Sequence, residues 1–143
     1  MYKHVLLPVD LNQEESWRKA LPVAIENCKA FGAELHVLTV IPDLHMPMIA
    51  SHFPENFMEK LILKMEAGIT KFVEDQVPKE IKASHAVVSG GKIYEMIIDY
   101  ANDHDVDLIV MEAYHPDLKD YLLGSNAEKV ARHARQSVLV VRE

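Results

Sequence analysis

The sequence contains a single cysteine, Cys28, so no internal disulfide can form, and this fits a reducing compartment. Basic residues are also scarce. The 15 lysines and arginines stand against 22 aspartates and glutamates, giving a formal net charge of −7. Nonspecific nucleic-acid binding and docking to an anionic membrane both require a basic surface that such a chain lacks. We therefore expect neither nucleic acid nor membrane among its partners.

Long apolar runs are absent as well, and no stretch of the sequence reaches the roughly 20 residues of a membrane-spanning helix. The first ten residues, MYKHVLLPVD, lack the charged leader, long apolar region and cleavage site of a signal peptide. These features predict a cytoplasmic protein. The 143 residues are enough for one domain with a hydrophobic core, which we expect to cover residues 1–143.

Five short apolar runs indicate β-strands. They are His4–Val9, Glu34–Ile41, Lys82–Val88, Asp107–Ala113 and Ser137–Arg142. Four of them are nearly continuous, which is typical of strands buried on both faces of a parallel sheet. The run at 82–88 is more polar, and we expect it at an edge of the sheet.

Segments with helical periodicity separate these runs, and they predict helices over Glu14–Phe31, Glu55–Asp75, Ile93–Ala101 and Ala127–Ala134. Pro22 should kink the first helix or split off its first turn. Gly32 follows at a position where a helix end favours a left-handed residue. The alternation of strands and helices predicts an α/β fold, with one open parallel five-stranded sheet and helices on both faces, as in Rossmann-like proteins. Between the second strand and the second helix, Pro42–Pro54 reads as a mobile loop.

Ligands of open α/β sheets bind beyond the carboxyl ends of the strands, where the strand order reverses. If the first strand is central, the crevice is formed by Pro8–Asp10, by Val40 and Ile41, and by Met111–Tyr114. Asp10 directly follows an apolar strand, so its carboxylate suits hydrogen bonds from a ribose or a base edge. The alternative is a helix cap or an Asx turn, and the two roles are compatible.

Gly124-Ser125-Asn126 precedes the last helical pattern and would close this crevice. Gly124 permits close backbone approach, while Ser125 and Asn126 suit capping of the helix and presentation of N–H groups to an anion. The alternative is a plain capped helix. The stretch upstream, MEAYHPDLKDY, contains no glycine.

Four segments resemble the universal stress protein family in the right order and over essentially the whole chain. They are HVLLPVD, AELHVLTVIP, DLIVM and LLGSNAEKVARHARQSVLVVR. The segment HPDLKDYLLGSNA resembles the F/G-type branch of that family. The resemblance implies the strand order 3-2-1-4-5, a role in the stress response, and ATP or AMP as a regulatory ligand. It also implies a homodimer. Pairing of the edge strand at 137–142 with its copy would satisfy an otherwise unpaired apolar edge. The identity of any further protein partner does not follow from the sequence.

Nucleotide-binding members of the family carry a motif of Gly, two residues, Gly, nine residues, Gly, then Ser or Thr. Gly124 and Ser125 match its end, but counting back places the first two glycines at Met111 and Tyr114. The ring of Tyr114 and the charge of Glu112 oppose a triphosphate there, whereas His115 and Lys119 would supply positive charge. The candidate cofactor-binding residues are Pro8, Val9, Asp10, Val40, Met111, Ala113, His115, Lys119, Gly124, Ser125, Asn126 and Ala127, with Mg²⁺ accompanying ATP as the only metal. The alternative is a nucleotide-free dimeric interaction protein with a degenerate phosphate loop.

The remaining reactive side chains do not indicate a dedicated enzyme. No Gly-x-Ser-x-Gly turn surrounds Ser125, and slow ATP hydrolysis or autophosphorylation stays open as an alternative. The eight histidines show no metal-binding spacing, so we expect no protein-bound metal site among them. Cys28 lies on the apolar stripe of the first helix and reads as a small buried hydrophobic residue rather than a redox nucleophile.

Overall fold

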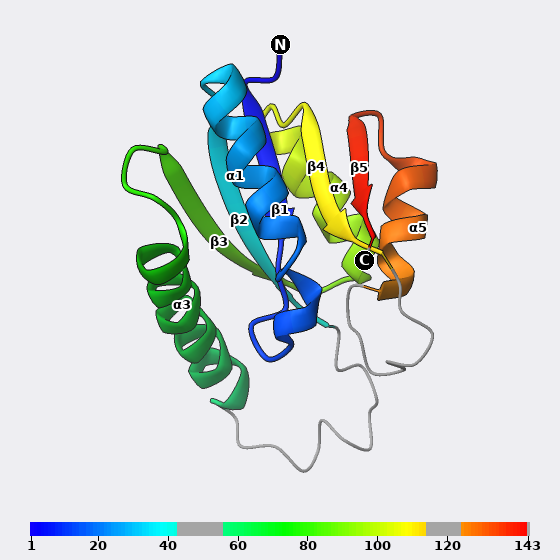
Figure 1. The fold of residues 1–143 in the computed structure, drawn as a ribbon. Helices are drawn as coiled ribbons and strands as arrows, with labels where there is room; N and C mark the ends of the chain where they lie inside the picture. Colours follow the sequence, from blue (N-terminus) through cyan, green and yellow to red (C-terminus); the bar gives the residue numbers. More distant parts are fainter. Residues whose placement is uncertain (43–55, 114–123, 143) are drawn as a thin grey trace.

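The computed structural model describes residues 1–42, 56–113 and 124–142 of the chain (Figure 1). The side chains of Gly124 and Ser125 are not described. His115 and Lys119, and the loop predicted at Pro42–Pro54 except for its first residue, lie outside the described residues.

Five parallel strands form one sheet. They are β1 (His4–Pro8), β2 (Glu34–Ile41), β3 (Ala83–Ser89), β4 (Leu108–Glu112) and β5 (Ser137–Val141). Their order is β3-β2-β1-β4-β5, so β1 is central and β3 and β5 are the edges. The predicted fold class and strand order are confirmed, and the more polar third strand lies at an edge as expected.

The helices divide between the two faces of the sheet. They are α1 (Ala20–Phe31), α3 (Phe57–Gln76), α4 (Ile93–Asp103) and α5 (Gly124–His133), and a short 3-10 helix, η1 (Glu14–Ser16), precedes α1. Figure 1 shows α1 and α3 on one face, with α4 and α5 on the other. The described helices include none that is both long and apolar enough to cross a membrane.

Two apolar clusters hold the helices to the sheet, and β1 contributes to both. Val5 and Leu7 pack into the cluster beneath α1 and α3, while Leu6 packs into the cluster beneath α4 and α5. All three side chains are fully buried. Because successive side chains of a strand point to opposite faces, a strand covered on both faces must be apolar at every position. This explains why the strand appears in the sequence as a continuous apolar run.

The first predicted helix is divided in two. Its start forms η1, and α1 begins at Ala20, so Pro22 lies in the first turn, where its missing N–H costs no intrahelical hydrogen bond. The predicted end is confirmed, because Gly32 has a φ of 65° and its N–H donates to the Cys28 carbonyl. The last helix begins at Gly124, earlier than the apolar pattern from Ala127 indicated.

Cys28 should be chemically inert in the folded protein. Its side chain is 2% exposed, and burial raises the pKa of its thiol to about 11, so almost no reactive thiolate exists near pH 8. We expect an aromatic disulfide reagent to leave the native protein unlabelled at pH 8 and to titrate one thiol per chain after denaturation in guanidinium. Rapid labelling of the native protein would contradict the buried position.

Candidate functional site

The strand order reverses at β1, which has β2 on one side and β4 on the other. The carboxyl ends of these three strands therefore form the switch point at which open α/β sheets bind ligands. Asp10 follows β1, Val40 lies near the end of β2 and Ala113 follows β4. The structure thus brings these three predicted site residues to the same edge of the sheet.

Three of the predicted residues pack on the face covered by α4 and α5. Val40, Met111 and Ala127 belong to one apolar cluster there, and Met111 is fully buried. Pro8 is buried at the end of β1, and the N–H of Ala113 donates to the Val141 carbonyl at 2.8 Å. The predicted apolar lining of the crevice is therefore a packed layer contributed by three strands and by α5.

Val9 contributes its backbone rather than its side chain to this end of the sheet. Its side chain packs into the opposite cluster, beneath α1 and α3. Its N–H donates to the Leu38 carbonyl at 2.8 Å, and its carbonyl accepts a 2.8 Å bond from the Thr39 hydroxyl. Thr39 is 4% exposed and was not singled out in the sequence, where it reads as an ordinary strand residue. It fixes the strand end that carries Asp10.

Asp10 is held in a turn that combines the two roles considered for it. Its Oδ1 accepts the N–H of Asn12 at 3.0 Å, which closes an Asx turn. Its own N–H donates to the hydroxyl oxygen of Ser16 at 2.9 Å, and that hydroxyl donates back to the Asp10 carbonyl. In the described part of the chain, no group donates to Oδ2. One carboxylate oxygen therefore builds the turn, while the other has no donor among residues 1–42, 56–113 and 124–142.

The charge of Asp10 is costly in this position. The residue is only 6% exposed, and burial raises the pKa of its carboxyl above the ordinary value of 3.8, against the smaller lowering effect of the Asn12 N–H. A buried carboxylate with a single hydrogen bond is the kind of perturbed group that gathers at functional sites.

Glu112 has a role that the sequence did not indicate. It is 7% exposed, and its Oε1 accepts the N–H groups of Lys19 at 2.7 Å and Ala20 at 2.8 Å, at the N-terminus of α1. The carboxylate thus satisfies two backbone donors that have no partner within the helix and sits at the positive end of the helix dipole. The sequence set the charge of Glu112 against a triphosphate, and that expectation stays a prediction; the structure adds its contact with α1.

The N-terminus of α5 lies where a phosphate site was expected. Because α5 begins at Gly124, the triplet Gly124-Ser125-Asn126 forms its first turn, whose N–H groups lack partners within the helix. Asn126 is 8% exposed and Ala127 is 2% exposed, so both are part of the packed layer. His115 and Lys119, the predicted cationic substitutes, lie outside the described residues.

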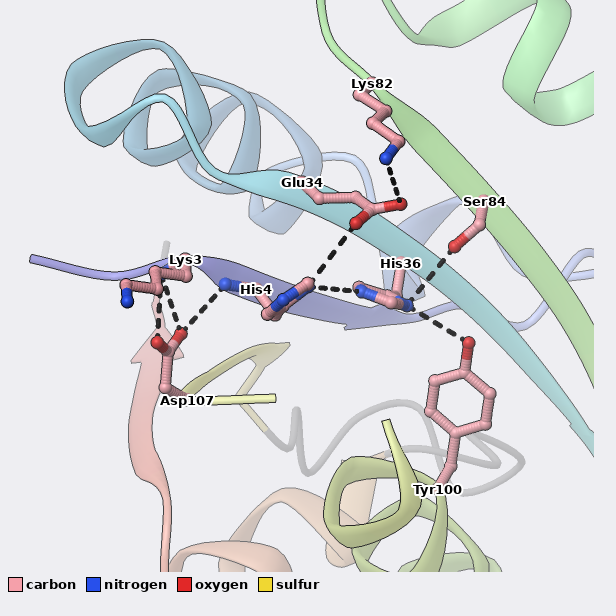
Figure 2. A network of polar contacts seen from close by, with 8 residues as sticks. All are labelled: Lys3, His4, Glu34, His36, Lys82, Ser84, Tyr100 and Asp107. Atoms are coloured by element: carbon pink, nitrogen blue, oxygen red, sulfur yellow. Dashed lines mark hydrogen bonds and ion pairs between the residues drawn. The ribbon is translucent and has the colours of Figure 1, made fainter. Parts of the chain in front are cut away.

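A second polar cluster, at the opposite end of the sheet, was missed by the sequence reasoning (Figure 2). It joins His4 of β1 to Glu34 and His36 of β2, because the parallel register sets His4 opposite Glu34. His36 is 6% exposed. Burial lowers the pKa of His36, with a raising effect from Glu34 and smaller lowering effects from His4 and His104. No spacing rule along one element could have found it, since the residues come from two strands.

This arrangement is that of a doubly wound α/β protein, with its strand order reversing at β1. The model of the universal stress protein family matches residues 1–142, and the chain belongs to that family. Universal stress protein G from Salmonella typhimurium strain LT2 is 30% identical over 148 residues, covering 99% of this chain and 100% of the relative.

Two solved structures show the same fold. A universal stress protein in complex with cAMP has 22% identity and a TM-score of 0.67, covering 99% of this chain and 97% of its own. A universal stress protein from Archaeoglobus fulgidus in complex with dAMP has 16% identity and a TM-score of 0.62, covering 97% of both chains. Some members of the fold family thus bind adenine nucleotides.

Glu112 should stabilise the fold through its contact with α1. We expect Glu112→Ala to lower the free energy of unfolding by about 2 kcal/mol, because a buried and a half-buried N–H group lose a charged acceptor. Glu112→Gln should cost about 1 kcal/mol, since the amide oxygen can still accept. Urea denaturation monitored by circular dichroism measures both values.

The matched control is Glu128→Ala on α5. The Glu128 side chain is 80% exposed and forms an ion pair with Arg132 at 3.8 Å. Its change in stability should stay within about 0.5 kcal/mol. If Glu112→Ala were no more destabilising than this control, Glu112 would not stabilise the start of α1.

Proposed function

We propose that this protein is a cytoplasmic regulatory protein of the stress response that binds an adenine nucleotide, ATP or AMP, at the carboxyl end of β1. The observation that carries the proposal is Asp10, a buried carboxylate with one oxygen available, at the point where the strand order reverses. The nucleotide complexes of the two related structures support the same ligand class.

In this proposal, different residues bind the ribose, the base and the phosphates of the nucleotide. The available oxygen of Asp10 accepts hydrogen bonds from the ribose hydroxyls, and Val40 provides apolar contact for the base. The first turn of α5 presents backbone N–H groups to the phosphates. The hydrogen bonds of Glu112 to the N-terminus of α1 offset part of its negative charge in this arrangement. Ligand binding then biases the conformations of the protein and changes a surface that a partner recognises.

The direct test is to identify what the protein carries when purified. The freshly isolated protein is denatured, and mass spectrometry identifies the released small molecules. Isothermal titration calorimetry with ATP, AMP and cAMP on the ligand-free protein then ranks the nucleotides. We expect about one adenine nucleotide per protein chain. No released nucleotide, together with no heat of binding up to millimolar concentration, would refute the proposal.

Asp10→Asn should separate ligand binding from stability. The substitution keeps an oxygen for the Asn12 N–H but loses the charge, so nucleotide affinity should fall about tenfold. At pH 7 the free energy of unfolding should rise, because the cost of a buried charge is removed.

The gain in stability should depend on pH. In the folded protein the pKa of the Asp10 carboxyl lies above 3.8, the ordinary value expected for the unfolded chain. Between these two pKa values, the folded state holds more protons than the unfolded state. Wild-type stability therefore falls as the pH rises through this window, and the advantage of Asp10→Asn appears there. Asp103→Asn, at an exposed position on α4, is the control and should show neither effect. A pH-independent difference would contradict a raised pKa of Asp10.

The competing function is a nucleotide-free interaction protein. In that case the Tyr114 ring would occupy the position that phosphate takes in nucleotide-binding members of the family. Tyr114→Gly tests it, since a gain of ATP binding would favour this alternative. Changing Met111 as well is a poorer test. Met111 is fully buried, and its replacement by glycine would leave a cavity costing about 2–5 kcal/mol.

We also propose that the protein is a homodimer that pairs through β5 of each subunit. β5 is an edge strand, and its apolar residues Val138 and Val140 are only half-buried while Leu139 is 38% exposed. Unpaired apolar edges favour association, and antiparallel pairing around a two-fold axis satisfies the same strand in both copies.

Leu139→Lys should shift this dimer to monomer, because it places a charge on the pairing edge. Sedimentation velocity at micromolar concentration gives the readout. Leu63→Lys on α3 is the matched control, because Leu63 is 65% exposed and far along the chain from the edge strand. A wild-type monomer at this concentration would refute the dimer, and dissociation by Leu63→Lys would place the interface elsewhere.

A further inference from the structure

At the amino end of the sheet, two imidazoles and one carboxylate come together from neighbouring strands. His4 Nδ1 lies 3.1 Å from His36 Nε2 and 3.5 Å from Glu34 Oε2. One nitrogen from each histidine and one oxygen of Glu34 all lie within 4.8 Å of one another. Figure 2 shows the two rings and the carboxylate directed toward each other across β1 and β2.

These separations fit the first shell of a tetrahedral metal ion. Zn²⁺ binds imidazole nitrogen and carboxylate oxygen at about 2.0–2.1 Å, so two of its ligands lie about 3.3 Å apart. The two contacts of His4 Nδ1 lie on either side of this value. The third separation, between His36 and Glu34, is within 4.8 Å, so side-chain shifts of up to about 1.5 Å place a cation among the three atoms.

The surroundings of His36 match those of a histidine ligand. With Nε2 directed at the cluster, its Nδ1 lies 3.2 Å from the Tyr100 hydroxyl and 3.2 Å from the Ser84 hydroxyl. Metal-bound histidines donate their second ring N–H to an oxygen in this way, and the contact fixes both tautomer and ring orientation. Tyr100 comes from α4 and Ser84 from β3, so two further elements hold the ring.

The other two ligands are also placed by the fold. The Asp107 carboxylate accepts the backbone N–H groups of Lys3 and His4, which fixes the start of β1. The side chains of His4 and Glu34 are 32% and 22% exposed, and both line a surface pocket of about 540 Å³. An ion from solution can therefore reach the cluster. The same pocket is also lined by Lys3, Lys29 and Lys82. Of these, Lys82 contacts Glu34, at 3.9 Å and through a side chain that is 83% exposed.

We propose that His4, Glu34 and His36 form a Zn²⁺-binding site that ties β1 to β2 at the amino end of the sheet, with water as the fourth ligand. Two nitrogens and one carboxylate oxygen are a donor set that zinc accepts, whereas Mg²⁺ and Ca²⁺ prefer all-oxygen sites. The ion takes the place of the direct contact between His4 Nδ1 and His36 Nε2. The site lies at the end of the sheet opposite Asp10, so it is separate from the proposed nucleotide site.

The test uses the full chain without a histidine tag, treated with a chelator and then titrated with Zn²⁺ by calorimetry. We expect one Zn²⁺ per chain with micromolar affinity or better, together with a rise in melting temperature. His4→Gln and Glu34→Gln should each weaken binding at least about tenfold. Co²⁺ in place of Zn²⁺ should give the strong visible absorption of a four-coordinate ion, and this band should be lost in both variants.

His85→Gln is the matched control, because His85 is an exposed histidine on β3. Its affinity for Zn²⁺ and its Co²⁺ spectrum should equal those of the wild type. Circular dichroism of each variant without metal checks that the fold is kept, and Glu34→Gln, being nearly isosteric, remains informative if His4→Gln does not fold. No Zn²⁺ binding by the wild type at micromolar concentration, or equal weakening by His85→Gln, would overturn the proposal.

Discussion

The structure depends on β1, which is hydrogen-bonded on both edges and buried on both faces. Its partners β2 and β4 are parallel to it, and helices cover both sides. No position of this strand can be polar without a partner, since an unpaired polar group buried there would cost several kcal/mol. Polar side chains that could bind a ligand therefore occur at the two ends of β1, where His4 and Asp10 lie.

At the carboxyl end, two buried carboxylates differ in how fully their charge is compensated. Glu112 receives two backbone N–H groups at the positive end of α1, so its charge contributes to the fold. Asp10 receives one, and its pKa is raised by burial. The difference decides which of the two is available to a ligand. A carboxylate already saturated by the backbone has little to offer an incoming hydroxyl, whereas Asp10 retains an acceptor.

The amino end is organised by different contacts. There, the rings of His4 and His36, the Glu34 carboxylate and the Tyr100 hydroxyl form one chain of polar contacts across three elements. His36 is buried, and both of its ring nitrogens have partners: His4 Nδ1 on one side, and the Tyr100 and Ser84 hydroxyls on the other. The two proposed sites therefore lie at opposite ends of the same fully packed strand and share no residue.

The fold class and the ends of several elements follow from local sequence patterns. The alternation of apolar runs with helical patterns gives the α/β class, and Gly32 ends α1 because a left-handed residue is needed there. Asp10 could be placed beyond the carboxyl end of the central strand, because a residue that directly follows a parallel strand lies at that edge of the sheet. Tertiary structure alone decided the rest. Glu112 meets Lys19 across 93 residues, and His4 meets His36 across 32. Such contacts depend on strand register and on the direction in which a side chain leaves its strand, and neither is encoded by the spacing of residues along one element.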